Sequence, residues 1–117
     1  MSVKHVDDID ASIVKDGICV SRKMLISLEE APNFAMREFQ IEPGGSMPNH
    51  TNTVEHEQYV IEGDAQVCIG EEIFFVHKGS IVFIPANIPH WYKNTGAGVF
   101  RFLCLVPNQP DMTVILE

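Results

Sequence analysis

Three of the five histidines in this 117-residue chain stand where they could bind one metal ion together. His50 and His56 lie six residues apart, and His90 comes from a distant segment. Neutral imidazole suits Zn, Fe, Ni, Cu or Mn, and it does not suit Ca or Mg. We therefore predict a divalent transition metal on these side chains, with His5 and His77 at the surface.

Two kinds of neighbouring side chain are further candidate ligands. Asn52 has the strand parity of His50 and His56, whereas Glu55 and Glu57 have the opposite parity. Alternate residues of a strand share a face, so the carboxylates should point outward unless a bend over 51–54 shifts the register. Asn52 offers an amide oxygen, a weaker ligand than imidazole, and is either an occasional ligand or a bystander. An incomplete shell leaves an open position, as catalytic metal sites do.

Three more side chains are candidates for a catalytic role. Tyr92 follows His90 by two residues and should line the same pocket. Cys104 belongs to an alternating apolar run over 100–106, whose even-numbered residues we expect to face inward. Arg37 lies in a second such run. If it faces inward, it is a buried cation able to bind a carboxylate or oxyanion; the alternative is an exposed salt bridge.

Short strands must position these side chains. Apolar-rich runs alternate with Gly, Pro, Asn and Asp, and no long segment has a helical period. Strands are predicted at 18–26, 35–41, 58–61, 66–69, 73–77, 81–84, 90–93 and 99–106, with a turn at 43–45 and shorter elements in 8–15 and 112–117. Closure removes exposed sheet edges, so the pattern predicts one antiparallel β-barrel or jelly-roll domain over 1–117.

The Gly and His spacing around the first histidines resembles the first motif of the cupin superfamily. Gly44, His50 and Gly63 fall on that motif's spacing. His56 takes its usual Glu position, and Asn52 takes the position of its second His.

The second cupin motif is matched by Gly79, Pro85, His90 and Asn94. Asn87 replaces the motif's inner Gly, a tolerable exchange because Asn adopts left-handed backbone more readily than other non-Gly residues. The resemblance extends to small, histidine-rich, manganese-binding cupins through 31–34, 36–37, 42–45 and 102–105. It implies a double-stranded β-helix (the cupin jelly roll), a manganese-type metal on four histidines, of which this chain has three, and dioxygenase-like chemistry.

Net charge and cysteine content indicate which partners and which cellular location to expect. The formal net charge is −8, from 16 acidic and 8 basic residues, and no basic stripe is present. Such a surface repels nucleic-acid phosphates and anionic lipid, so neither is expected as a partner. The three cysteines are far apart and odd in number, which favours reduced thiols and a cytoplasmic location. We expect a homodimer, because a short barrel leaves an apolar face and edge strands to cover.

Two functional hypotheses follow. The first is a metal-dependent enzyme, an oxygenase-type catalyst acting on a small organic molecule, with isomerase or lyase action as a variant. The second is a non-catalytic small-molecule binding module or structural metal-binding module, since a fold does not decide a function.

Overall fold

The structure is a computed structural model of the chain, and it describes residues 1–116. Almost all of its regular structure is β-strand, with one 3-10 turn, η1, at Val6–Asp8. In that described part the strands are β1 (Ser12–Ile13), β2 (Ile18–Ile26), β3 (Phe34–Asn52), β4 (His56–Glu62), β5 (Asp64–Ile69), β6 (Glu72–His77), β7 (Ile81–Ile84), β8 (His90–Lys93), β9 (Phe100–Pro107) and β10 (Thr113–Ile115).

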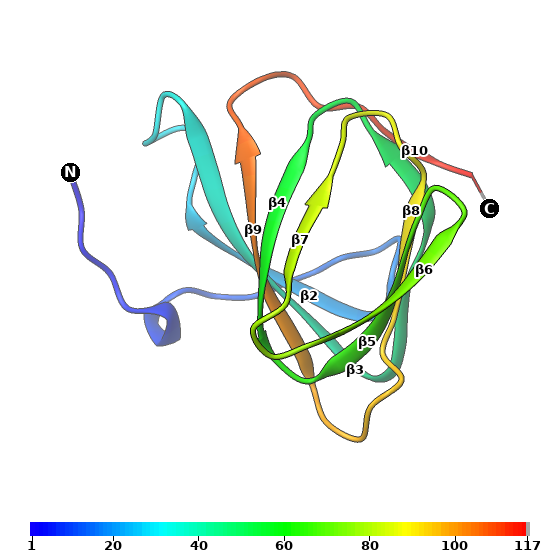
Figure 1. Cartoon of the computed structure of the whole chain (residues 1–117). Helices are drawn as coiled ribbons and strands as arrows, with labels where there is room; N and C mark the ends of the chain where they lie inside the picture. Colours follow the sequence, from blue (N-terminus) through cyan, green and yellow to red (C-terminus); the bar gives the residue numbers. More distant parts are fainter. Residues whose placement is uncertain (117) are drawn as a thin grey trace.

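All strand pairs are antiparallel, and the main sheet has the order β6-β5-β8-β3-β9-β4-β7. The sheet curls so that β9, β4 and β7 form one wall and β8, β5 and β6 form the other, with the long strand β3 belonging to both (Figure 1). The predicted antiparallel cupin-type jelly roll is therefore confirmed.

The turn predicted at 43–45 is wrong, because β3 continues through it. Its first part pairs with β9 up to Ile41, and its later part pairs with β8 from Ser46. Gly44 has φ +79°, and a Cβ on Gly45 would lie 2.6 Å from the Ile18 carbonyl oxygen. These glycines form a corner where the strand crosses from one wall to the other.

The barrel interior is filled by alternate residues of each strand. On β9 the buried set is Phe100, Phe102, Cys104 and Val106, so the predicted inward face is confirmed. Cys68 and Cys104 are buried free thiols, while Cys19 is exposed. Asn87 has φ +68°, the left-handed backbone predicted for the position of the inner motif Gly.

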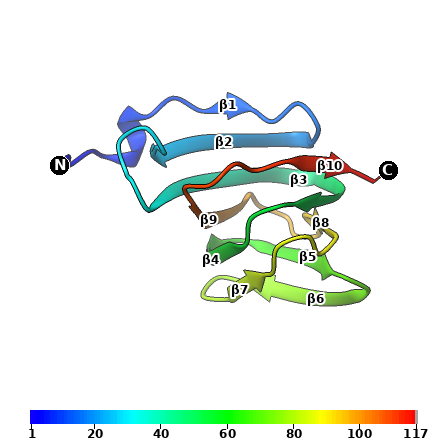
Figure 2. The ribbon, with the colours of Figure 1, turned by 90° about the horizontal axis from the view of Figure 1, so that it is seen from above.

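Strands from both ends of the chain, β2 and β10, pair with β3 (Figure 2). β2 matches the predicted edge strand at 18–26, and the 8–15 region gives only the end of η1 and the two-residue β1. β10 confirms an outer strand within 112–117, of which Glu117 lies outside the described residues. Over residues 1–116, no helix has the length and apolar character that a membrane crossing requires.

Candidate metal centre

His50, His56 and His90 come from three strands and meet inside the barrel. His50 lies on β3, His56 begins β4 and His90 begins β8, and the β3–β8 register pairs His50 with His90. The ring centroids of His50 and His90 are 4.2 Å apart, and those of His56 and His90 are 5.8 Å apart. All three side chains are buried.

Backbone carbonyls fix the orientation of two of these rings. The Nδ1 of His50 lies 2.7 Å from the Pro48 carbonyl oxygen, and that of His90 lies 2.9 Å from the Ile88 carbonyl oxygen. A carbonyl only accepts, so each Nδ1 carries the hydrogen and leaves an Nε2 lone pair free. The Nε2 atoms of His56 and His90 are buried without a hydrogen-bond partner in residues 1–116. Orphaned imidazole nitrogens of this kind fit a transition metal.

The surroundings keep His56 and His90 neutral. Burial, followed by the positive charge of Arg37 and the neighbouring histidines, lowers the pKa of His56 to about 3. Burial lowers the pKa of His90 to about 4, against the opposing hydrogen bond to Ile88. Both rings are therefore uncharged at neutral pH, as metal ligation requires.

The three histidines lie near one another but are not arranged around one ion. Imidazoles bound to one ion at ~2.1 Å place their ring centroids roughly 4.5–5.5 Å apart. One observed separation is shorter than this and the other is longer. Within the described part of the chain, no group of three or more His, Cys, Asp or Glu side chains is spaced to hold a metal ion. The three-histidine metal centre therefore stays a prediction.

The histidines border a small cavity. Its lining comprises Phe39, Met47, His50, His56, Gln58, Tyr92 and Phe102. About 30 Å³ is open to the centres of water-sized molecules, which is enough for an ion or one or two waters, since one water needs ~10–15 Å³. Tyr92 lines the cavity as predicted, edge-on to His90 and stacked on Phe102.

Gln58 is a site residue that the sequence interpretation missed. Its Nε2 donates to the Tyr92 hydroxyl at 2.7 Å and to the Cys104 sulfur at 3.6 Å. Burial raises the pKa of Tyr92, so the phenol stays protonated. The signal was present, because Gln58 is two residues after His56 and shares its face.

Arg37 faces the barrel interior, so the salt-bridge alternative is wrong for this side chain. Its Nη2 lies 3.2 Å from the Cys104 sulfur, and its guanidinium carbon lies 5.0 Å from the Phe39 ring centroid. In residues 1–116, Arg37 makes no salt bridge and its Nε is buried without a partner. Burial raises the pKa of the Cys104 thiol despite the nearby guanidinium, so Cys104 offers Arg37 a neutral thiol.

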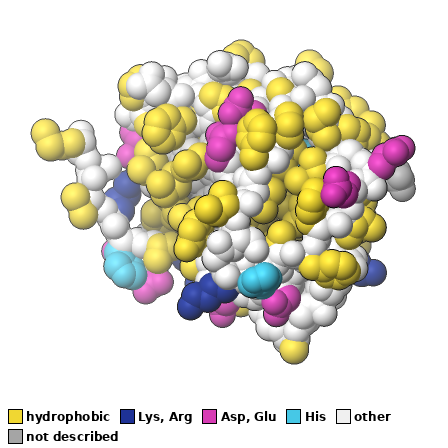
Figure 3. Space-filling view, viewed as in Figure 1, with side chains coloured by type: hydrophobic (Ala, Val, Ile, Leu, Met, Phe, Trp, Pro, Cys, Tyr) yellow, Lys and Arg dark blue, Asp and Glu magenta, His cyan; other side chains and the backbone are white. Residues whose placement is uncertain are grey.

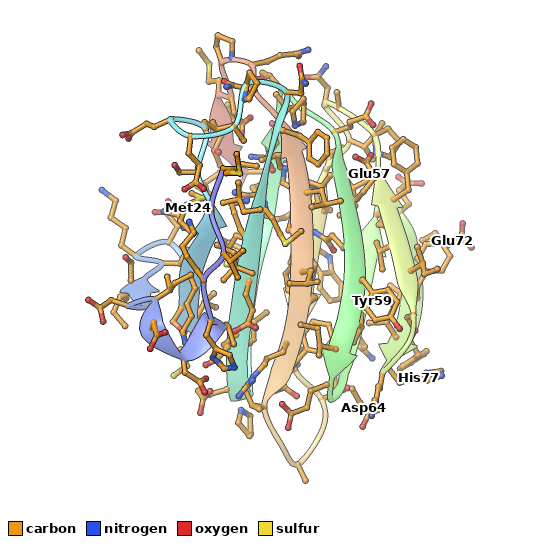
Figure 4. The ribbon with its side chains drawn as sticks, turned by 90° about the vertical axis from the view of Figure 1, so that its left-hand side faces the viewer. Met24, Glu57, Tyr59, Asp64, Glu72 and His77 are labelled. Atoms are coloured by element: carbon orange, nitrogen blue, oxygen red, sulfur yellow. The ribbon has the colours of Figure 1, made fainter. Side chains whose placement is uncertain are left out.

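Asn52 is buried two residues after His50 on β3, and the carboxylates point away. The Asn52 amide nitrogen donates to Asp111 and Thr113, while its Oδ1 is buried with no partner in the described residues. Glu55 is exposed, and Figure 4 shows Glu57 with Tyr59 on the outside of β4, as the strand parity predicted.

Comparison with known proteins identifies relatives of the same size. A family model described as "Cupin domain" matches residues 37–106. The uncharacterised protein MJ1618 of Methanocaldococcus jannaschii is 28% identical over 114 residues, covering 95% of this chain and 91% of that protein.

Comparison with solved structures also finds proteins that resemble this chain along most of its length. The polyketide cyclase RemF from Streptomyces resistomycificus is 31% identical, with a TM-score of 0.89 over 100% of this chain and 87% of that one. A predicted oxalate decarboxylase from Thermotoga maritima has a TM-score of 0.83 at 18% identity, over 91% of this chain and 98% of that one, a likeness of fold alone.

Proposed function

This chain belongs to the cupin domain family, and on that premise we propose that it is a metal-dependent enzyme acting on a small oxyanion-bearing organic molecule. One observation carries the proposal. Two buried, unpartnered imidazole nitrogens, on His56 and His90, lie in the same barrel as Arg37, a guanidinium without a carboxylate partner in residues 1–116. Metal ligands and an anion-binding cation together make a site for an anionic substrate.

Each protein group has a definable task. His50, His56 and His90 would hold the metal, which supplies an electrophilic centre and, if it is Fe or Mn, access to oxygen chemistry. Arg37 would bind a carboxylate or enolate oxygen of the substrate, because a guanidinium is a permanent cation with several donors. Tyr92, oriented by Gln58, offers a protonated hydroxyl at the cavity wall.

The first test concerns metal binding and oxygen use. We expect the protein stripped with EDTA to take up one equivalent of Fe²⁺ or Mn²⁺, and the Fe²⁺ form to consume oxygen with a catechol, thiol or keto-acid substrate. His56→Ala and His90→Ala should each lower metal affinity by a factor of ten or more. His77→Ala, at an exposed histidine, is the matched control and should bind metal normally. Equal metal binding by all four proteins would contradict the proposal.

A second candidate reaction is ring closure without oxidation. The relative named as a polyketide cyclase aligns with the whole chain at 31% identity. Metal exchange separates the two candidates, since Zn²⁺ is redox-inactive but polarises carbonyl oxygens. A Zn²⁺ form that converts a poly-keto substrate without consuming oxygen would favour cyclisation. Activity confined to the Fe²⁺ or Mn²⁺ form, with oxygen uptake, would favour oxygenation.

The non-catalytic alternative has its own signature. The open space beside the histidines is only about 30 Å³, so a binding module would hold something very small or would have to open. Ligand-induced thermal stabilisation with no turnover for any metal would favour that alternative over an enzyme.

A further inference from the structure

The Asn52 amide is held in one orientation by the C-terminal segment. Its Nδ2 lies 3.2 Å from Asp111 Oδ2 and 2.9 Å from Thr113 Oγ1, so both amide hydrogens have acceptors. An ionised carboxylate only accepts hydrogen bonds, so turning the amide over would set oxygen against oxygen. The hydrogen-bond chemistry therefore fixes Oδ1 as the free end of Asn52.

That free oxygen lies on the histidine side of β3. Asn52 follows His50 by two residues on the same strand, and both side chains are more than nine-tenths buried. Oδ1 has no hydrogen-bond partner in residues 1–116.

The C-terminal segment is anchored to the strand that carries these residues. β10 pairs with β3, Thr113 opposite Asn52 and Ile115 opposite His50. Asp111 Oδ1 accepts from the Thr53 backbone N–H at 3.0 Å, and the Met112 N–H donates to Thr53 Oγ1 at 2.9 Å. Figure 2 shows β10 lying along β3. The contacts that orient Asn52 thus belong to a defined element.

We propose that Asp111 and Thr113 are positioning residues that present Asn52 Oδ1 as a fourth donor to the metal held by the histidines. The inference rests on the proposed function and adds one oxygen donor to the three nitrogen donors of the histidines. It assigns the C-terminal segment a part in the site, and it predicts which metals the site prefers.

The expected consequence is a shift in metal preference. Replacing a carbonyl oxygen by an imidazole favours Ni²⁺, Cu²⁺ and Zn²⁺ relative to Mn²⁺, because Mn²⁺ prefers oxygen ligands more strongly than these ions do. An Asn52→His variant, with the nitrogen donor usual at this position in the motif, should bind Ni²⁺ at least tenfold more tightly relative to Mn²⁺ than the parent does. Asn52→Ala should weaken Mn²⁺ binding and admit one more water to the ion, which water-proton relaxation of the Mn²⁺ complex measures.

Asp111→Asn tests the positioning itself. The new amide can donate to Asn52 Oδ1 and so permits Asn52 to turn its nitrogen toward the histidines. We expect Mn²⁺ affinity, measured by electron paramagnetic resonance titration of free Mn²⁺, to fall about 10- to 100-fold, the usual effect of losing an outer-shell partner. Thr113→Val removes only one acceptor and should weaken Mn²⁺ binding less. It serves as the second variant if Asp111→Asn folds poorly.

Thr53→Val is the matched control. It removes the hydrogen bonds of Thr53 Oγ1 with Pro110, Asp111 and Met112. It leaves the Thr53 N–H bond to Asp111 and both Asn52 hydrogen bonds, so Mn²⁺ affinity should stay within about twofold of the parent. Unchanged Mn²⁺ affinity and Ni²⁺ preference in Asn52→Ala, Asn52→His and Asp111→Asn would overturn the inference alone, provided that His56→Ala lowers metal affinity tenfold or more. A parent protein that binds neither Mn²⁺ nor Ni²⁺ would overturn both this inference and the proposed function.

Discussion

At the scale of single residues, the buried histidines link the site to the stability of the fold. His56 and His90 have folded-state pKa values of about 3 and about 4, lowered chiefly by burial. In the unfolded chain they titrate near their ordinary value of about 6.5. Between these values the unfolded state binds more protons than the folded state. Stability must therefore fall as the pH falls.

We expect the metal-free, EDTA-treated protein to lose stability steadily from about pH 6.5 down to about pH 4. Each of the two histidines contributes up to ~1.4 kcal/mol per pH unit over that window. His56→Gln should make the loss shallower, whereas His77→Gln, at an exposed position, should not. Urea titrations at several pH values measure the slopes. An unchanged slope in His56→Gln would show that His56 titrates normally in the folded protein.

Strand parity predicted much of the residue-scale detail. Alternation along β8 and β9 placed Tyr92 and Cys104 on inward faces, and alternation at the start of β4 placed Glu57 outward, because period-two alternation depends only on local backbone geometry. The same rule would have found Gln58. The contact between Arg37 and the Cys104 thiol was beyond sequence reasoning, since it depends on the β3–β9 register that sets these residues opposite each other.

At the scale of elements, the corner in β3 at Gly44 and Gly45 sets how the two walls of the barrel join. A methyl group on Gly45 would meet the Ile18 carbonyl oxygen at 2.6 Å and the Glu42 carbonyl oxygen at 2.9 Å, and both are backbone atoms. Backbone cannot move aside as a side chain can, so the strain falls on the corner itself.

We expect Gly45→Ala to destabilise the protein by about 2 kcal/mol, within the range for overpacked sites. Gly98→Ala is the matched control, because a methyl group there meets nothing within 4 Å, and it should change stability little. Thermal unfolding of the two variants provides the comparison. Equal melting temperatures would mean that the corner relaxes at no cost.

The same corner explains the failed turn prediction. Pro-Gly-Gly punctuates a chain in the same way whether the strand reverses or bends into a second wall. Only the pairing of β3 with distant strands distinguishes a reversal from a bend. β3 pairs with β9 before the corner and with β8 after it. The remaining strand positions were predictable because each is a short apolar run with its own flanking turn residues.

At the scale of the whole molecule, the outer face of the wall formed by β9, β4 and β7 exposes several large apolar side chains. Ile81 is 81% exposed, Phe83 56% and Tyr59 52%, on the adjacent strands β4 and β7. Leu103 and Leu105 continue this surface onto β9, where they line one shallow depression with Ile81 and Tyr59. Figure 3 shows many hydrophobic side chains and few Lys or Arg on one face of the molecule. Apolar patches of this kind mark interaction surfaces.

We predict that this wall pairs two copies of the chain in a symmetric homodimer. Sedimentation equilibrium should give about twice the 13.1 kDa chain mass, and Ile81→Glu should return the monomer. Ile13→Glu, at an 82% exposed position on the edge strand β1, should leave the dimer intact. A monomeric parent protein would contradict the prediction. A dimer broken only by Ile13→Glu would move the interface to the N-terminal edge of the sheet.

The small interior cavity has a kinetic consequence. Its wall includes Met47, an unbranched side chain with several rotamers, beside the stiffer rings of Phe39 and Phe102. A molecule larger than one or two waters would fit beside the histidines only if these side chains moved. The rates of ligand entry and release would then be limited by the fluctuations of these side chains. A bound ligand would dissociate more slowly than its direct contacts alone predict.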